Sequence, residues 1–124
     1  MLPQLSAAVR VFLCTRPTDL RKGFDGLSGL VQECFSQDVL TGHLFLFLNR
    51  RRDRMKILYF DRDGLVIWYK RLEAGCFQNP EPIPNAAQLS GSAGVELSVA
   101  DLALILNGID LATAQRRKRY SRAG

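Results

Sequence analysis

Short apolar runs of strand length recur through the first seventy residues of the chain. They are rich in β-branched and aromatic residues, and residues typical of turns separate them, which is the pattern of β-strands. The pattern predicts four strands, near residues 9–14, 43–48, 54–60 and 65–71. The last three follow one another closely enough to form two consecutive hairpins. Because the run 43–48 is apolar almost throughout, we expect it to be the central strand, covered on both faces.

An amphipathic helix is predicted over about 18–35, where apolar residues recur at steps of three and four. Thr18 and Asp19 can cap its N-terminus. Glycines at three positions inside it each lower the helix propensity by up to about 1 kcal/mol relative to Ala. We therefore expect packing against a sheet to stabilise this helix.

A shorter helix is predicted over about 99–107, because Ser98 and Asp101 have the spacing of a capping box and an apolar stripe follows. Together these elements predict an α+β fold, in which a small antiparallel sheet is covered on one face by the helix 18–35.

A single domain is expected, because 124 residues leave little room for a second. Along the chain we distinguish a core, 1–77, a loop rich in Pro, Asn and Ser, 78–94, a C-terminal helical segment of the same domain, 95–111, and a basic tail, 112–124.

Composition excludes several classes of protein. With 47% hydrophobic and 23% charged residues the chain can form a core. It has neither an apolar run of about 20 residues nor a secretory signal, so we expect a cytoplasmic protein without membrane contact. Three dispersed cysteines and the single His43 offer no ligand or triad spacing. We expect His43 to be a strand-edge residue, and the chain to use no metal, cofactor or small-molecule substrate.

Charge is distributed unevenly along the sequence. The net charge is +5, and every Lys and Arg lies before Glu73 or after Gln115, while the interval between them contains only acids. This distribution favours an anionic partner such as nucleic acid.

Arginines gather at the turn between the first two hairpin strands, where several guanidinium groups could track a phosphate backbone. The alternative is a solvated turn that protects a strand edge from aggregation. The basic tail could be a nucleic-acid-binding arm or only a solubilising end. The candidate nucleic-acid-binding residues are Arg21, Lys22, Arg50, Arg51, Arg52, Arg54, Lys56, Lys70, Arg71, Arg116, Arg117, Lys118 and Arg119.

Aromatic residues lie among these basic positions. Tyr59, Trp68 and Tyr69 could stack on bases, although Trp and Tyr also fill cores, which is the interpretation we favour for Trp68. Asp61 and Asp63 flank a turn in which Gly64 can adopt a positive φ, and we expect turn chemistry there rather than a metal site. No carboxylate pair predicts a catalytic centre.

Three ordered motifs give the sequence a resemblance to a known family. They are TRPTDLRKGFDGL at 15–27, NRRRDRMKILYFD at 49–61 and WYKRLEAG at 68–75. The chain resembles TnpB, the second open-reading-frame (Orf2) protein of the bacterial insertion sequence 66 (IS66) family. The matching motif positions are Asp19, Arg21, Lys22, Gly23, Phe24, Gly26, Arg50, Arg51, Asp53, Arg54, Lys56, Tyr69, Lys70 and Arg71.

What the resemblance implies is an accessory protein of transposition, encoded beside a separate transposase that cleaves and joins the strands. Its expected partners are DNA, at the ends of the element, and that transposase. An adaptor that binds only protein is the alternative, and a nuclease using Asp61 and Asp63 is a third. The chain departs from the family pattern at Arg52, where family members often have Gly. It also departs at Cys76 and Asn79. Arg52 calls a glycine-dependent turn into question.

Overall fold

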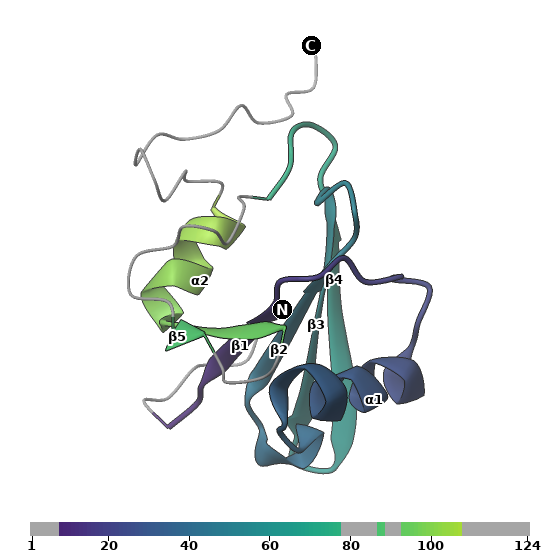
Figure 1. The fold of residues 1–124 in the computed structure, drawn as a ribbon, viewed down its shortest axis with the longest axis vertical. Helices are drawn as coiled ribbons and strands as arrows, with labels where there is room; N and C mark the ends of the chain where they lie inside the picture. Colours follow the sequence, from purple (N-terminus) through teal and green to yellow (C-terminus); the bar gives the residue numbers. More distant parts are fainter. Residues whose placement is uncertain (1–7, 78–86, 89–92, 108–124) are drawn as a thin grey trace.

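The order of secondary-structure elements matches most of the sequence pattern. The computed structural model describes residues 8–77, 87–88 and 93–107 of the chain. Figure 1 shows the elements, which are β1 (Val11–Cys14), α1 (Phe24–Phe35), the 3-10 helix η1 (Val39–Thr41), β2 (Leu44–Leu48), β3 (Arg54–Asp61), β4 (Gly64–Arg71), β5 (Ala87–Gln88), β6 (Gly94–Leu97) and α2 (Val99–Leu106). The four predicted strands, both predicted helices and the α+β class are confirmed.

The strands form one mixed sheet in the order β4-β3-β2-β1-β6-β5. The prediction of a wholly antiparallel sheet was wrong in one pairing, because β1 and β2 are parallel, with Phe12 opposite Phe45. The chain between them runs through α1, the kind of long crossover that a parallel pair requires. The remaining pairs are antiparallel.

Strand β6 occupies residues that the sequence assigned to a loop and a helical segment. It pairs with β1, and the pairing is supported by an ion pair between Arg10 and Glu96 at 2.6 Å. The Arg10 guanidinium lowers the pKa of Glu96 by donating hydrogen bonds to its carboxylate. A strand of four residues beside a helix cap carries little periodicity, which is why its sequence did not reveal it.

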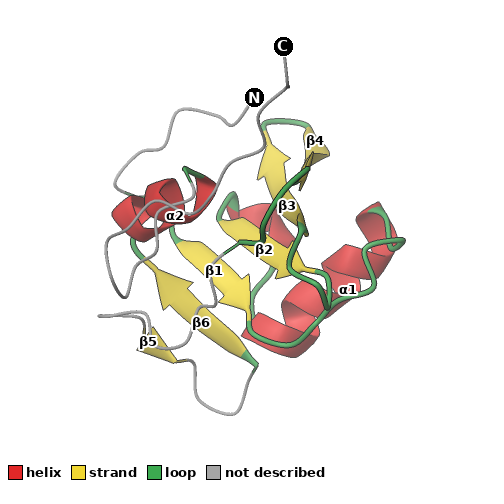
Figure 2. Ribbon diagram, turned by 90° about the horizontal axis from the view of Figure 1, so that it is seen from above, coloured by secondary structure: helices red, strands yellow, loops and turns green. Residues whose placement is uncertain are grey.

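The two helices lie against opposite faces of the sheet (Figure 2). On the α1 side, four phenylalanine rings pack together with centroid separations of 5.4 to 5.9 Å; they are Phe12, Phe35, Phe45 and Phe47. On the α2 side, Leu102 and Ile105 bury against strand residues such as Leu13 and Ile57. β2 is buried throughout, as predicted, but the sheet has a second helical cover that we did not expect.

Helix α1 begins later than predicted. Its N-cap is Gly23 and no side chain caps it. The predicted caps have other roles, because the Thr18 N–H donates to the Leu48 carbonyl at 2.8 Å and the Asp19 carboxylate accepts hydrogen bonds from Arg21. Residues 15–23 therefore form a loop fixed to the end of β2.

His43 supports the sheet, as expected of a strand-edge residue. Its Nδ1 accepts a hydrogen bond from the backbone N–H of Arg10 at 3.0 Å, and burial lowers the pKa of the imidazole. The three cysteines are free, and burial raises the pKa of the Cys14 thiol to about 11. Within the described residues, neither helix is long and apolar enough to cross a membrane.

Candidate nucleic-acid interface

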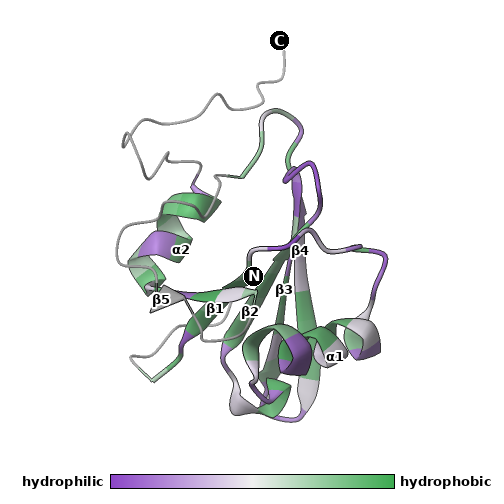
Figure 3. Cartoon of the chain, viewed as in Figure 1, coloured by the Kyte–Doolittle hydropathy of each residue, from purple (hydrophilic) through white to green (hydrophobic). Residues whose placement is uncertain are grey.

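All three sequence motifs meet at one end of the sheet. The β1–α1 loop is tied to β2 by the bond from Thr18 to Leu48. The segment after β4 is tied to the β2–β3 turn, because the Leu72 N–H donates to the Asp53 carbonyl and the Phe77 N–H to the Arg52 carbonyl, both at 2.7 Å. In Figure 3 the β2–β3 turn is hydrophilic, whereas most of the sheet beneath it is hydrophobic.

Asn49 organises the β2–β3 turn. Its side-chain amide donates to the Asp53 carboxylate at 2.6 Å, and its Oδ1 accepts from the Arg54 N–H at 3.0 Å. Its carbonyl accepts from the Arg52 N–H, also at 3.0 Å. The turn is thus held by its own polar groups, and its arginine side chains remain available for other contacts.

Arg52 adopts the left-handed conformation, with a φ of 56°. This is the position where the resembled family often has Gly, so the turn keeps a glycine-like backbone with an arginine in place. A left-handed backbone costs about 1–2 kcal/mol in residues other than Gly. The sequence departure therefore does not abolish the turn geometry.

We predict that Arg52→Gly is more stable than Arg52→Ala by about 1 kcal/mol, because glycine removes the left-handed penalty that alanine retains. Both variants lose the same guanidinium group, so their difference isolates the backbone. The free energy of unfolding in urea measures it. A glycine variant no more stable than the alanine variant would contradict the assigned backbone conformation.

At the β2–β3 turn and the start of β3, three exposed guanidinium groups have no hydrogen-bond or salt-bridge partner among the described residues; they belong to Arg50, Arg51 and Arg54. The nearby Asp53 carboxylate accepts the Asn49 amide instead. Several like charges on one short turn repel one another unless an anion lies among them. The turn is therefore suited to bind phosphate groups.

Two other predicted binding residues are paired with acids. Arg21 lies 2.8 Å from Asp19, and Arg71 lies 2.7 Å from Glu73. The Arg21 hydrogen bonds lower the pKa of Asp19 to about 2, so this carboxylate is ionised at neutral pH. These exposed pairs partly neutralise the surroundings of the turn, whereas Arg50, Arg51 and Arg54 have no such acidic partner among the described residues.

Strand alternation decides which predicted residues come together. Lys56 faces Tyr69, and Arg54 faces Arg71, on the side of the sheet that carries α1. The Lys56 ammonium group donates to the Lys22 carbonyl at 3.0 Å, which brings the loop to this side. We use the name basic surface for the cations on this side together with those of the adjoining β1–α1 loop and β2–β3 turn; it comprises Arg21, Lys22, Arg50, Arg51, Arg52, Arg54, Lys56 and Arg71.

Other predicted residues lie elsewhere. Lys70 faces Met55 and so projects from the opposite side of the sheet, away from the basic surface. Arg116, Arg117, Lys118 and Arg119 lie outside the described residues, as does Asn79. The exposed Cys76 lies in the segment that follows β4.

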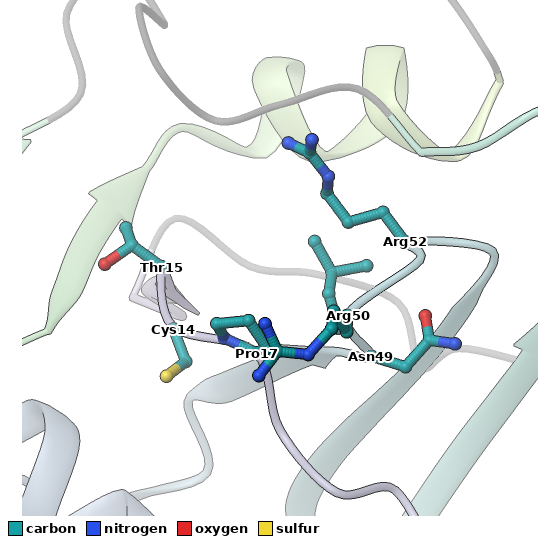
Figure 4. Close-up of a pocket in the computed structure, with 7 residues that line it drawn as sticks. Cys14, Thr15, Pro17, Asn49, Arg50 and Arg52 are labelled. Carbon is teal, nitrogen blue, oxygen red and sulfur yellow. The ribbon is translucent and has the colours of Figure 1, made fainter.

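Shallow pockets flank the β1–α1 loop, and two of them adjoin the β2–β3 turn. One, of about 220 Å³, lies between the loop and the turn and is lined in part by Pro17, Arg50 and Arg52. Figure 4 shows Arg50 and Arg52 leaving the turn in different directions. The other, of about 290 Å³, is lined by Thr18, Asp19, Leu20, Arg21, Asn49, Arg54 and Tyr69.

The aromatic residues divide between core and surface. Tyr59 is buried and Trp68 packs against the α2-side core, so the core interpretation of Trp68 is confirmed. Tyr69 is 49% exposed, and the Lys56 ammonium group lies 5.0 Å from its ring centroid. Adjacent strand residues face opposite sides, but the sequence did not show which of Trp68 and Tyr69 faces outward.

Asp61 and Asp63 lie at the β3–β4 turn, at the far end of β3 from Arg54. The positive φ of this turn belongs to Arg62, at 55°, and not to Gly64 as predicted. The Asp63 N–H donates to the Asp61 carbonyl. Among the described residues no three Asp, Glu, His or Cys side chains are grouped to hold a metal ion.

Comparison with known proteins bears on the same motifs. A family model described as IS66 Orf2 like protein matches residues 9–116. Two relatives from Sinorhizobium fredii (strain NBRC 101917 / NGR234) are themselves named uncharacterized proteins. One, y4hO, is 33% identical over 124 residues, 100% of both chains; the other, y4jC, is 30% identical over 112 residues, 90% of this chain and 89% of its own. No solved structure matches the chain.

Proposed function

Because the chain belongs to the family of IS66 Orf2-like proteins, we propose that it is an accessory protein of insertion-sequence transposition that binds DNA through its basic surface. Strand cleavage and joining are left to the separate transposase, which is its second proposed partner. The DNA it meets in this role is that of the element ends.

The observation that carries the proposal is the set of guanidinium groups at the β2–β3 turn for which the described residues provide no partner. Arginine keeps its charge at any working pH and bonds phosphate oxygens in pairs. Hydrogen bonds of the Asn49 side chain and backbone hold the turn, so the groups are presented by an ordered element. Arg21, Lys22 and Lys56 would extend the contact along the phosphate backbone.

Phosphate contacts position a protein on DNA but do not read its sequence. The described basic surface therefore favours binding to any DNA, and preference for the element ends would come from the transposase or from the tail residues Arg116, Arg117, Lys118 and Arg119. This division of labour fits an accessory protein better than an independent sequence reader.

A mobility-shift titration of the purified full chain tests the proposal, using a duplex and a single strand from the element end and matched random DNA. We expect binding to every probe, with an affinity that falls linearly in log–log form as salt rises, by about 0.9 per phosphate contact for a duplex. No shift of any probe at low salt, together with co-purification with the transposase, would favour the adaptor that binds only protein.

A further inference from the structure

Tyr69 stands out on the basic surface because a large ring is exposed among cations. The Tyr69 side chain is 49% exposed, whereas the neighbouring Trp68 packs against the core on the other side of the sheet. The Lys56 ammonium group lies over the ring at 5.0 Å from its centroid, as in a cation–π pair. The ring is thereby held in place while much of its surface remains open to a planar ligand.

The ring also forms a wall of the pocket of about 290 Å³ beside the β1–α1 loop. This volume lies just below the range of about 300–1,000 Å³ typical of sites for drug-sized ligands, so the pocket fits a small planar group. Leu20 contributes an apolar side chain to the pocket, and Arg21 and Arg54 contribute guanidinium groups.

Arg54 is placed to hold a phosphate next to that group. In the β3–β4 pairing, Lys56 lies opposite Tyr69 and Arg54 lies one same-face position further along, opposite Arg71. Diagonal neighbours of this kind are about 7–8 Å apart, close enough for one nucleotide to reach both side chains. Within the described residues Arg54 has no acidic partner, so its guanidinium group is available.

We propose that Tyr69 and this pocket bind one unpaired nucleotide, with its base stacked on the Tyr69 ring and its phosphate on Arg54. The inference rests on the proposed function and deepens it by assigning single-stranded DNA to the basic surface. Paired bases in a duplex have their faces covered by neighbouring bases, so an exposed ring can stack only on a base that has left the stack.

The test removes the Tyr69 ring from the protein and, separately, the bases from the DNA strand. Wild type, Tyr69→Thr and Tyr69→Phe are titrated by fluorescence anisotropy against a labelled mixed-sequence single strand, the same length of abasic strand, and a duplex. Thr keeps the strand propensity of the site without a ring, and Phe keeps the ring without the hydroxyl.

We expect Tyr69→Thr to bind the single strand about 5- to 100-fold more weakly, which is the range for one lost stacking contact. Tyr69→Phe should stay within about threefold of wild type, and duplex affinity should change less than about threefold in both. Wild type should prefer the normal strand to the abasic strand, and Tyr69→Thr should lose that preference.

Different results would overturn the stacking role of Tyr69 and the DNA-binding function. If wild type binds duplex and single strand but Tyr69→Thr retains the preference for bases, the stacking role is overturned and the proposed function stands. A loss shared by Tyr69→Thr and Tyr69→Phe would assign the effect to the hydroxyl and also overturn stacking. If wild type binds none of the three probes at low salt, the DNA-binding function fails and the nucleotide site fails with it.

Discussion

Replacing Arg50, Arg51 and Arg54 together with Ala should weaken DNA binding at least about tenfold without unfolding the protein. Each is exposed and has no side-chain partner in the described part of the chain, so no native hydrogen bond is lost. A charge-assisted hydrogen bond contributes about 1.5–3 kcal/mol, and about 1.4 kcal/mol corresponds to a tenfold change in affinity. Loss of a single phosphate contact would therefore be measurable.

The salt dependence of binding gives a second and more specific readout. The log–log slope should flatten by up to about 2.7 on duplex DNA, because three contacts at about 0.9 each are removed. A triple Lys variant at the same positions should keep most of the slope, since the charges remain, while losing paired bonds to phosphate.

Position is tested by two single variants that remove one charge each. Arg54→Ala removes a charge from the basic surface, whereas Arg62→Asn removes one at the other end of β3. Asn is chosen there because it tolerates the left-handed backbone of position 62. Only Arg54→Ala should weaken binding appreciably. Equal effects of the two variants would show that net charge alone matters, and an unchanged slope in a folded triple Ala variant would remove the turn from the interface.

Local patterns were sufficient to predict the hairpins of this fold. The runs in β2, β3 and β4 are apolar and closely spaced, so their pairing needs only short turns and their register follows from the chain. Similarly, Ser98 and Asp101 form the predicted capping box at the start of α2. In each case the decisive interaction lies within a few residues of sequence.

The pairings between strands far apart in the chain could not be predicted from local sequence patterns. β1 pairs in parallel with β2 across α1, and antiparallel with β6, which lies some eighty positions later. Neither contact leaves a local signature, because a four-residue strand looks the same whichever partner it has. The helix α2 was predicted, but its place on the second face depends on β6 and was therefore missed.

In the candidate site, too, local sequence predicted some features, and others depend on how the strands pair. The arginine-rich turn was predicted from the arginines that gather between two predicted strands, and the structure adds that Asn49 orders it. That Lys70 faces away and Tyr69 faces the basic surface depends on strand register. A register slip of one residue would exchange the two, so only the pairing of β3 with β4 could decide which side chain belongs to the site.

Gly94→Ala should produce the largest loss of stability among the substitutions considered, about 1–3 kcal/mol or more. A Cβ at Gly94 would lie 2.7 Å from Cε1 of Phe35 and 3.1 Å from the Cys34 carbonyl oxygen. The Phe35 ring is buried and packs against other phenylalanine rings, so it cannot move aside without disturbing them. Overpacking of a dense core costs free energy in this range.

The matched control is Gly29→Ala, the same chemical change at a site where no described atom outside the neighbouring residues and the backbone of α1 lies within 4 Å of the added Cβ. Gly29 lies inside α1, where alanine favours the helix by up to about 1 kcal/mol, so this variant should be more stable than wild type. Relative to wild type, the free energy of unfolding in urea should fall for Gly94→Ala and rise for Gly29→Ala if α1 packs onto β6 as described.

Adding Phe35→Leu should recover part of the Gly94→Ala loss, because the smaller side chain makes room for the methyl group. A Gly94→Ala protein as stable as wild type would mean that Phe35 does not lie on β6, and the placement of α1 across the end of this strand would be wrong.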